Sequence, residues 1–219
     1  MKDLLYKEAA MKIHTLNLGI LRVNCYVVET APGKCVIIDL GGDPDYLLKF
    51  LREHRLKLSK ILITHGHFDH IGGAEEVRKK TGAEVYIHVD DAKCLQSKAY
   101  SLADDIPYYI FTPVTDWTAV TGDCIINDGD LSFKVIHTPG HSEGSVCYVC
   151  KDVIFSGDTL FRYSVGRTDF AGSNPIDMKN SLRTLALLDG DYKVLPGHNE
   201  PTTLSAERLY NPFMKEALK

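Results

Sequence analysis

Four side chains able to bind a metal ion lie within six residues of one another in the segment THGHFDHIGG, residues 64–73. They are His65, His67, Asp69 and His70. The backbone between them is too short to wrap all four around one tetrahedral ion. Two neighbouring ions, one held by His65 and His67 and the other by Asp69 and His70, relieve that strain and keep open coordination positions. Open positions are typical of catalytic metal sites, so the segment predicts a two-metal catalytic centre.

Packing alone does not explain such a cluster. Burying a polar group without a partner costs roughly 2–7 kcal/mol, and here four such groups directly follow an apolar strand pattern, KILIT. Further ligands are expected at other strand ends. Three candidates each follow an apolar run and a glycine, which lets the chain turn sharply beside a site: His141, Asp158 and His198.

The elements that must position these residues alternate between short β-type runs and helical patterns. In the first half we expect strands at residues 12–21, 24–29, 35–40, 60–64 and 84–89, with helices starting at residue 43 and covering 73–80 and 90–97. In the second half we expect strands at 131–137, 145–150, 153–156 and 192–195, with helices over 177–188 and from 205 onward. Hairpin-like neighbours in both halves favour mixed sheets. The pattern predicts two β-layers with helices outside.

The composition excludes several classes of protein. A chain of 219 residues with 44% hydrophobic residues suits one compact domain, and 17 glycines with 9 prolines are too few for a fibrous or low-complexity chain. The net charge of −4 leaves no positive excess to neutralise a phosphate backbone, so nucleic acid is not expected as a partner. No apolar stretch is long enough for a membrane span or a secretory signal. We therefore expect a cytoplasmic protein that does not bind membranes.

Six cysteines are expected to be reduced thiols, because a cytoplasmic chain of this size needs no disulfides. Cys147 and Cys150 form a C-x-x-C pattern inside an apolar run. Residues three apart in a strand point to opposite faces of the sheet. The two sulfurs are therefore not expected to share a metal.

The full ligand pattern, H-x-H-x-D-H, a distant histidine, G-D and P-G-H, resembles the metallo-β-lactamase fold superfamily. The segments GDTLF (157–161), VGRTD (165–169) and PGH (196–198) resemble its glyoxalase II-like, or hydroxyacylglutathione hydrolase-like, branch. The similarity covers residues 11–219, which are expected to form a single metallo-hydrolase domain, with residues 1–10 as an N-terminal extension. The resemblance implies an α/β fold, an αββα sandwich of two mixed sheets with outer helices and a two-metal site at one edge.

Carried over position by position, the resemblance also implies a ligand set. The first ion would take His65, His67 and His141; the second would take Asp69, His70 and His198; Asp158 would bridge the two. Imidazole and carboxylate ligands suit zinc, with iron or manganese as alternatives. The expected cofactor is thus a pair of divalent ions.

The charge balance agrees with hydrolysis. Two divalent cations carry +4, Asp69 and Asp158 remove two charges, and a bridging hydroxide removes a third, which leaves a site that attracts acyl oxygens. Paired ions roughly 3.5–4 Å apart lower the pKa of bridging water and polarise a carbonyl. We expect the hydroxide to attack the carbonyl of a small-molecule thioester and a thiolate to leave. Asp69 is the expected catalytic residue, which orients the hydroxide or relays its proton.

Other residues are expected to support the site. Asp39, at the end of the strand CVIID, is predicted to hydrogen-bond a ligand rather than to bind metal. His137 is predicted to have the same role or a purely structural one, and the remaining lone histidines, His14, His54 and His88, to be structural. Residues 97–124, rich in aromatic side chains, are predicted to be either a surface excursion packed on the body or a wall of the substrate pocket.

Three side chains that follow Asp158 are candidates to bind a substrate carboxylate: Arg162, Tyr163 and Arg167. For Arg167 an ion pair with Asp169 is an equally good interpretation.

Substrate and oligomeric state stay open. Only 21 residues follow His198, too few for the C-terminal helical domain of full-length glyoxalase II. A thioester other than S-lactoylglutathione, or a lactone, is therefore an alternative substrate. The main rival hypothesis is a persulfide dioxygenase-like oxidoreductase with one iron held by His65, His67 and Asp158. The complete second set of ligands favours the hydrolase.

Overall fold

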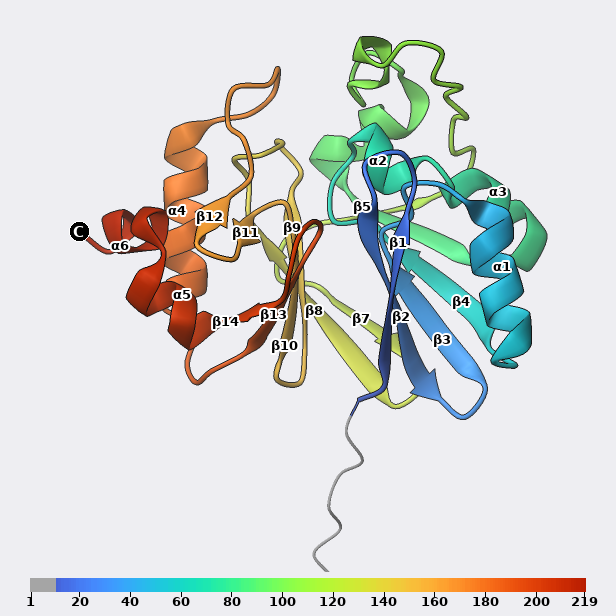
Figure 1. Ribbon diagram of the computed structural model, residues 1–219, viewed down its shortest axis with the longest axis horizontal. Coiled ribbons are helices and arrows are strands. Elements are labelled where there is room, and N and C mark those ends of the chain that lie inside the picture. The colour runs from blue at the N-terminus through green and yellow to red at the C-terminus, as the bar shows by residue number, and fades with distance from the viewer. Residues whose placement is uncertain (1–10) are drawn as a thin grey trace, which may run out of the picture.

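Two six-stranded sheets pack face to face, and helices cover their outer sides (Figure 1). This computed structural model describes residues 11–219, so the predicted extension over residues 1–10 lies outside the described residues. The strand order is β1-β2-β3-β4-β5-β6 in the first sheet and β14-β13-β10-β9-β8-β7 in the second, and β11 and β12 form a separate hairpin. The predicted αββα sandwich is confirmed.

The first half of the chain forms the first sheet and its covering helices. Its strands are β1 (Ile13–Leu18), β2 (Val23–Ala31), β3 (Lys34–Ile38), β4 (Lys57–Leu62), β5 (Glu84–His88) and β6 (Thr118–Val120). Its helices are α1 (Pro44–Glu53), α2 (Phe68–Ile71) and α3 (Ala74–Thr81), with 3-10 helices η1 (Val89–Gln96) and η2 (Ala103–Asp105).

The second half of the chain forms the second sheet, the β11–β12 hairpin and the helices that cover this sheet. Its strands are β7 (Ile125–Asp128), β8 (Leu131–His137), β9 (Val146–Cys150), β10 (Val153–Gly157), β11 (Leu160–Phe161), β12 (Ser164–Val165), β13 (Lys193–Pro196) and β14 (Thr202–Thr203). Its helices are α4 (Pro175–Ala186), α5 (Leu204–Tyr210) and α6 (Pro212–Ala217). None of the helices within residues 11–219 is both long and apolar enough to cross a membrane.

Both sheets are mixed, and their parallel parts fix where the site lies. β3, β4, β5 and β6 run parallel, while β1, β2 and β3 pair antiparallel. In the second sheet β10 and β13 are parallel, and β8 runs in the same direction because it and β10 both pair antiparallel with β9. The loops that follow the carboxyl ends of β4, β8, β10 and β13 can therefore meet at one edge of the sandwich. Sites in sheets of this kind usually lie at the carboxyl ends of the strands.

The core between the sheets is apolar and fully buried. Val28, Val36 and Ile38 of the first sheet belong to one cluster with Phe133 and Phe155 of the second. Two outer clusters attach the helices, one beneath α1 and α3 and one beneath α4, α5 and α6. Burial of this kind is worth roughly 25 cal/mol for each Å² of apolar surface, so the sandwich is a rigid base for the loops at its edge.

The C-x-x-C pair divides between two of these clusters. Cys150 packs between the sheets, whereas Cys147 packs under the outer helices. Both lie in β9, so their sulfurs point to opposite faces, as predicted. All six cysteines are free thiols.

Some element boundaries differ from the predicted ones. The first strand ends at Leu18 because the chain turns at Gly19, whose φ is +77°, and the Arg22 amide donates to the Gly19 carbonyl at 3.1 Å. The helix predicted over residues 90–97 is the 3-10 helix η1, Val89–Gln96.

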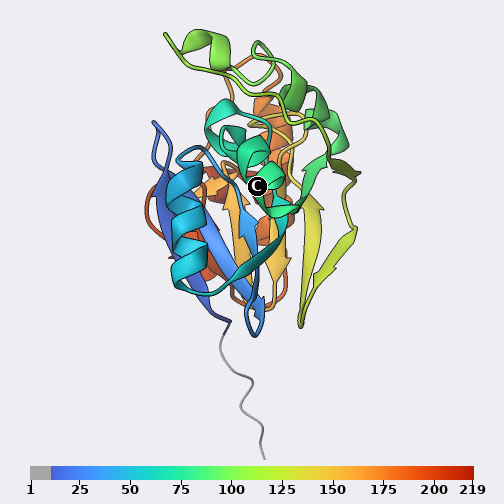
Figure 2. The same ribbon diagram turned by 90° about the vertical axis from the view of Figure 1, so that its right-hand side faces the viewer.

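Residues 97–117 project at the end of the sandwich that carries α2, as both ribbon views show (Figures 1 and 2). Val114 is fully buried in the core beneath α1 and α3, and Phe111 and Trp117 pack against it. The Tyr109 hydroxyl donates to the Phe68 carbonyl at 3.3 Å. The excursion thus packs on the body, directly beside the segment predicted to bind metal.

Candidate metal centre

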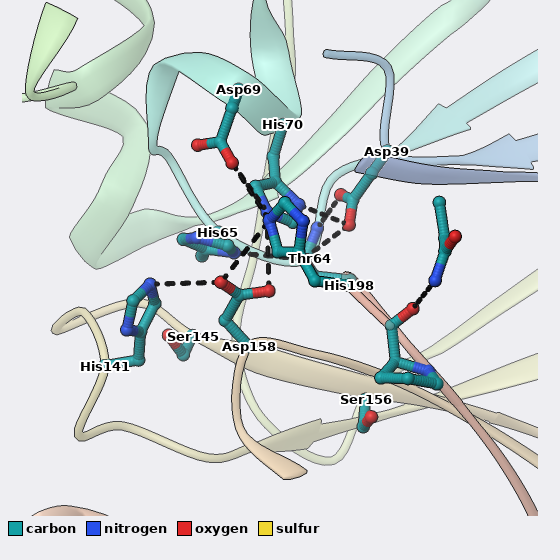
Figure 3. A network of polar contacts seen from close by, with 12 residues as sticks. Asp39, Thr64, His65, Asp69, His70, His141, Ser145, Ser156, Asp158 and His198 are labelled. Carbon is teal, nitrogen blue, oxygen red and sulfur yellow. Dashed lines mark hydrogen bonds and ion pairs between the residues drawn. The ribbon is translucent and has the colours of Figure 1, made fainter. Parts of the chain in front are cut away.

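Seven predicted ligands from four loops lie together at the edge between the sheets. Four come from the loop and short helix after β4, and one each from the loops after β8, β10 and β13. Figure 3 shows that those it labels converge on one point: His65, Asp69, His70, His141, Asp158 and His198. The sequence-predicted set is therefore brought into one cluster.

The first donor group consists of His65, His67 and His141, all buried. One nitrogen of each lies within 4.8 Å of the others. The ring centroids are 4.6–4.8 Å apart, and the rings are nearly perpendicular, with interplanar angles of 77–84°. Three imidazoles in this arrangement suit one face of a tetrahedral ion and leave its fourth position open.

The second donor group consists of Asp69, His70 and His198. His198 Nε2 lies 3.0 Å from Asp69 Oδ2, and His70 Nε2 lies 3.6 Å from the same oxygen. Two donor atoms that each lie 2.0–2.1 Å from a tetrahedral ion are about 3.4 Å apart. The observed separations therefore match a shared cation.

The Asp158 carboxylate lies between the two groups. Its Oδ1 is 3.4 Å from His70 Nε2, and its Oδ2 is 3.6 Å from His141 Nε2. One carboxylate thus reaches a histidine of each group, which is the placement that a bridging ligand requires.

Unsatisfied buried atoms show that the residues fit metal ions. Within residues 11–219, three buried side-chain atoms have no hydrogen-bond partner: His65 Nε2, His70 Nε2 and Asp158 Oδ1. All three belong to this cluster. Buried polar atoms are normally paired, and divalent cations in the two groups would satisfy all three atoms.

The opposite ring nitrogens are held by hydrogen bonds. His70 Nδ1 donates to Asp39 Oδ2 at 2.8 Å, and His141 Nδ1 donates to the carbonyl of Arg167 at 2.8 Å. Because Nδ1 donates in each ring, Nε2 is the nitrogen that faces the cluster. Such contacts orient metal-binding histidines and raise their basicity.

Asp39 connects two of the histidines, His70 directly and His65 through Thr64. The Thr64 hydroxyl donates to Asp39 Oδ2 at 2.7 Å, so its oxygen is left to accept from His65 Nδ1 at 3.1 Å. The Thr64 amide donates to Asp39 Oδ1 at 2.7 Å. Asp39 is therefore not one of the predicted donors, but it is hydrogen-bonded to one of them, His70.

Asp91 is a residue that sequence reasoning missed. Its buried carboxylate accepts from the Gly66 amide at 2.7 Å, the Ser142 hydroxyl at 2.7 Å and the Gly144 amide at 2.8 Å. Gly66 lies between two predicted ligands, and Ser142 follows another. The carboxylate therefore ties together the two loops that form the first donor group. Its sequence signal is weak: an acidic pair just after the strand that ends at His88.

Gly197 is needed for space rather than for a turn. A Cβ at this position would lie 2.3 Å from Asp158 Oδ1 and 2.7 Å from His70 Cε1. The expected sharp turn before each ligand holds for Gly140 and Gly157, whose φ values are +141° and +49°. At Gly197 the backbone itself forms a wall of the cluster.

Electrostatics separate the two donor groups. Burial, reinforced by neighbouring imidazoles, lowers the pKa of His67 to about 3 and that of His65 well below its usual value. Burial also disfavours charge on His70, but Asp39, Asp69 and Asp158 together raise its pKa to about 10. The pKa of Asp69 is lowered, because His70 and His198 outweigh its burial. Without metal, His65 and His67 are neutral and His70 carries a proton amid three carboxylates.

We expect zinc binding at pH 7 to release about one proton from His70, because ion and proton compete for Nε2. Affinity should therefore fall as the pH is lowered. Calorimetric titration of the metal-free protein in buffers of different ionisation enthalpy measures the release. Asp39→Asn, which removes the largest contribution that raises the His70 pKa, should lower it. An exposed-site control, Asp189→Asn, should not. Equal proton release from wild type and Asp39→Asn would contradict this account.

Only one of the three candidate substrate contacts lines the cavity beside the cluster. That is Arg167, whose guanidinium also pairs with Asp169 at 2.8–2.9 Å and lies 4.2 Å from the Phe170 ring centre. Arg162 and Tyr163 form the tip of the β11–β12 hairpin, outside the residues that line this cavity.

His137 also lies apart from the donor cluster. Its Nε2 donates to the Glu143 carbonyl at 2.9 Å, and its ring stacks on His88 at 4.0 Å. Among the described residues, no hydrogen bond, ion pair or ring contact joins it to a predicted ligand. The structural interpretation of His137 and His88 fits these contacts.

The cavity beside the cluster has a volume of about 320 Å³. Its floor contains predicted ligands of both groups. Its walls are mostly apolar and are formed by Leu21, Phe68, Leu102, Phe161, Val165 and Phe170. A small acyl group would fit against such walls.

Two mixed sheets with a histidine–aspartate cluster at one edge define the class of proteins with the metallo-β-lactamase fold. A family model described as the metallo-beta-lactamase superfamily matches residues 18–198. This chain belongs to that superfamily. The hydroxyacylglutathione hydrolase GloC of Haemophilus influenzae is similar to it, with 31% identity over 213 residues that cover 93% of this chain and 98% of the relative. Family and relative together indicate a metal-dependent hydrolase.

Solved structures agree on the fold. The BLEG-1 B3 metallo-beta-lactamase superimposes with a TM-score of 0.84 at 34% identity, covering 93% of this chain and 99% of that one. TTHA1623 in a di-iron-bound form gives 0.82 at 34% identity, covering 91% and 99%. ETHE1 from Myxococcus xanthus gives 0.77 at 29% identity, covering 92% and 84%. One fold thus accompanies several differently named proteins, so the fold alone does not define the reaction.

Proposed function

We propose that this protein is a two-metal hydrolase that cleaves a small-molecule thioester of the hydroxyacylglutathione type. The observation that carries the proposal is the position of Asp158, whose two oxygens lie near histidines of both donor groups. The similarity to a hydroxyacylglutathione hydrolase over nearly the full chain supports the same substrate class.

Two divalent ions held by these groups would supply a nucleophilic hydroxide at neutral pH and polarise the acyl carbonyl. The protein's own part is to place and shield the reactants. Asp69 lines the cavity, and its Oδ2 lies 3.0 Å from His198 Nε2. Because its lowered pKa keeps it ionised, Asp69 can accept a hydrogen bond from an attacking water and fix its direction. The apolar walls exclude other water from the acyl group.

The lining of the cavity favours a substrate with a good leaving group. Apart from the predicted ligands, Arg167 is the one charged side chain among the described residues that line it. A guanidinium does not give up its proton at neutral pH, so no free general acid is available. An amine must be protonated to leave, whereas a thiol with a pKa near 8.5 leaves readily as the thiolate. Thioesters therefore suit this site better than amides.

The test is turnover of a substrate panel by protein of measured metal content. With about two zinc ions per chain, we expect hydrolysis of S-lactoylglutathione or another lactoyl thioester, slower hydrolysis of lactones, and little action on β-lactams. Protein loaded with iron or manganese should be tested in parallel. Absence of turnover on every thioester at full metal occupancy would refute the proposal.

The rival hypothesis of a mononuclear-iron oxidoreductase is tested on the same samples. Oxygen consumption with glutathione persulfide by protein that holds one iron would favour it. The second donor group weakens this hypothesis, because a single iron would leave Asp69, His70 and His198 grouped together without an ion.

A further inference from the structure

A second cavity adjoins the one at the donor cluster. It has a volume of about 530 Å³ and shares two lining residues, Leu21 and His198, with the first cavity. A substrate whose carbonyl lies at the donor cluster can therefore extend past His198 into this second space.

The two cavities differ in polarity. The first has mostly apolar walls. The second is lined mainly by polar side chains of β1, β2, the turn between them and the loop after β13: Thr15, Asn17, Arg22, Asn24, Asn199 and Glu200. A thioester has two sides, an acyl group and a thiol. The apolar cavity suits a small acyl group, so the larger polar cavity is left for the thiol.

Arg22 is the unpaired charge in this second cavity. No hydrogen bond or ion pair from the described residues reaches its guanidinium. The acid in the same lining, Glu200, lies 3.5 Å from Arg162 instead. Asp43, near the base of the same turn, accepts from the Gly19 amide at 2.8 Å. An unpaired guanidinium prefers a planar anion such as a carboxylate, which it can bind with two hydrogen bonds.

The backbone around Arg22 is held in place. The Arg22 amide closes the β1–β2 turn on the Gly19 carbonyl at 3.1 Å. The base of the turn lies tightly against the loop after β3, since a Cβ on Gly19 would lie 2.7 Å from the Gly41 carbonyl oxygen. A cation on a fixed turn selects between ligands better than one on a mobile loop.

Asn17 adds a second recognition element. Its Nδ2 donates to Asn24 Oδ1 at 2.5 Å, which orients its amide, and its own Oδ1 has no partner among residues 11–219. Asn24 is in turn fixed by bonds to the carbonyls of Pro196 and Asn199 at 3.0 and 2.9 Å. An oriented amide oxygen accepts a hydrogen bond from a peptide N–H.

We propose that the second cavity binds the thiol half of the substrate and that Arg22 is a specificity-determining residue that binds a carboxylate on that thiol. The preferred leaving group is thus a peptide-like thiol with at least one carboxylate. This inference rests on the proposed function.

The test compares two thioesters with the same acyl group, S-lactoylglutathione and S-lactoyl-N-acetylcysteamine, whose leaving thiol is neutral. Arg22→Gln should lower kcat/KM for the first by about tenfold, the scale of one charged hydrogen bond, and leave the second within about twofold. Arg22→Glu should lower the first further. Arg52→Gln, an exposed arginine on α1, is the matched control and should change neither. The preference of wild type for the anionic substrate should shrink as salt is added.

A binding measurement separates this inference from the proposed function. S-methylglutathione is a thioether that cannot be hydrolysed, and calorimetry should show about tenfold weaker binding to Arg22→Gln than to wild type. Equal binding, or an equal loss of kcat/KM on both thioesters, would overturn the role of Arg22. If wild type hydrolyses neither thioester yet binds S-methylglutathione through Arg22, the proposed reaction is wrong and the anion site stands.

Discussion

Replacing Asp158 by alanine is expected to lower thioester turnover by at least about a hundredfold. Loss of a residue that merely orients a metal ligand typically costs 10–100-fold, and Asp158 lies within 3.6 Å of histidines from both donor groups. Its removal takes away the charge and the oxygens that connect the two groups. Metal content should fall together with kcat, because His70 Nε2 and His141 Nε2 both lose a neighbouring carboxylate.

Two further variants make this prediction specific. Asp158→Asn keeps the volume and one carbonyl oxygen but loses the charge, so it should retain more metal than Asp158→Ala and still be strongly impaired. Asp189→Ala, an exposed aspartate near the end of α4, should match wild type in turnover and metal content. Near-normal turnover by Asp158→Ala with two bound metal ions would show that Asp158 does not bridge them.

Replacing Asp91 by alanine is expected to lower the stability of the fold strongly. Asp91 is 1% exposed, and its carboxylate accepts three hydrogen bonds, from the Gly66 amide, the Ser142 hydroxyl and the Gly144 amide. A buried donor left without a partner costs about 1–3 kcal/mol, so the free energy of unfolding should fall by about 3 kcal/mol or more. Because these bonds hold the loops of the first donor group, zinc affinity should fall as well.

Urea unfolding of the metal-free protein measures this effect without any contribution from bound ions. Asp91→Asn should lie between wild type and Asp91→Ala, because the amide oxygen can still accept while the amide nitrogen faces a backbone N–H. Asp105→Ala, exposed in the excursion, should change stability by no more than about 0.5 kcal/mol. An unfolding free energy of Asp91→Ala equal to that of wild type would contradict the assigned role.

Most of the candidate donor cluster could be predicted because its signals are local. The pattern H-x-H-x-D-H lies in one loop and the short helix α2 that follows it, and the other predicted ligands follow apolar strands and glycines. Strand direction then brings them together, since β4, β8, β10 and β13 all deliver their carboxyl ends to one edge. The layers could be predicted for the same reason, from alternating patterns and short continuous apolar runs within single strands.

The roles of Asp91 and Arg162 could not be predicted, since they depend on contacts distant in sequence. Asp91 meets Gly66 and Gly144 only when two loops 78 residues apart are folded together. Arg162 follows Asp158 closely in sequence, yet the tight β11–β12 hairpin places it at a turn. Its flanking residue Phe161 lines the cavity in its stead. Proximity along the chain was a poor guide to direction in space.

Each donor group takes side chains from both halves of the sandwich. His65 and His67 follow a strand of the first sheet and His141 one of the second; Asp69 and His70 are likewise joined by His198. An ion in either group would therefore act as a reversible cross-link between the halves. Ligands that bind only the folded state add stability that grows with the logarithm of their free concentration. The lifetime of this protein in a cell would then follow the supply of its metal.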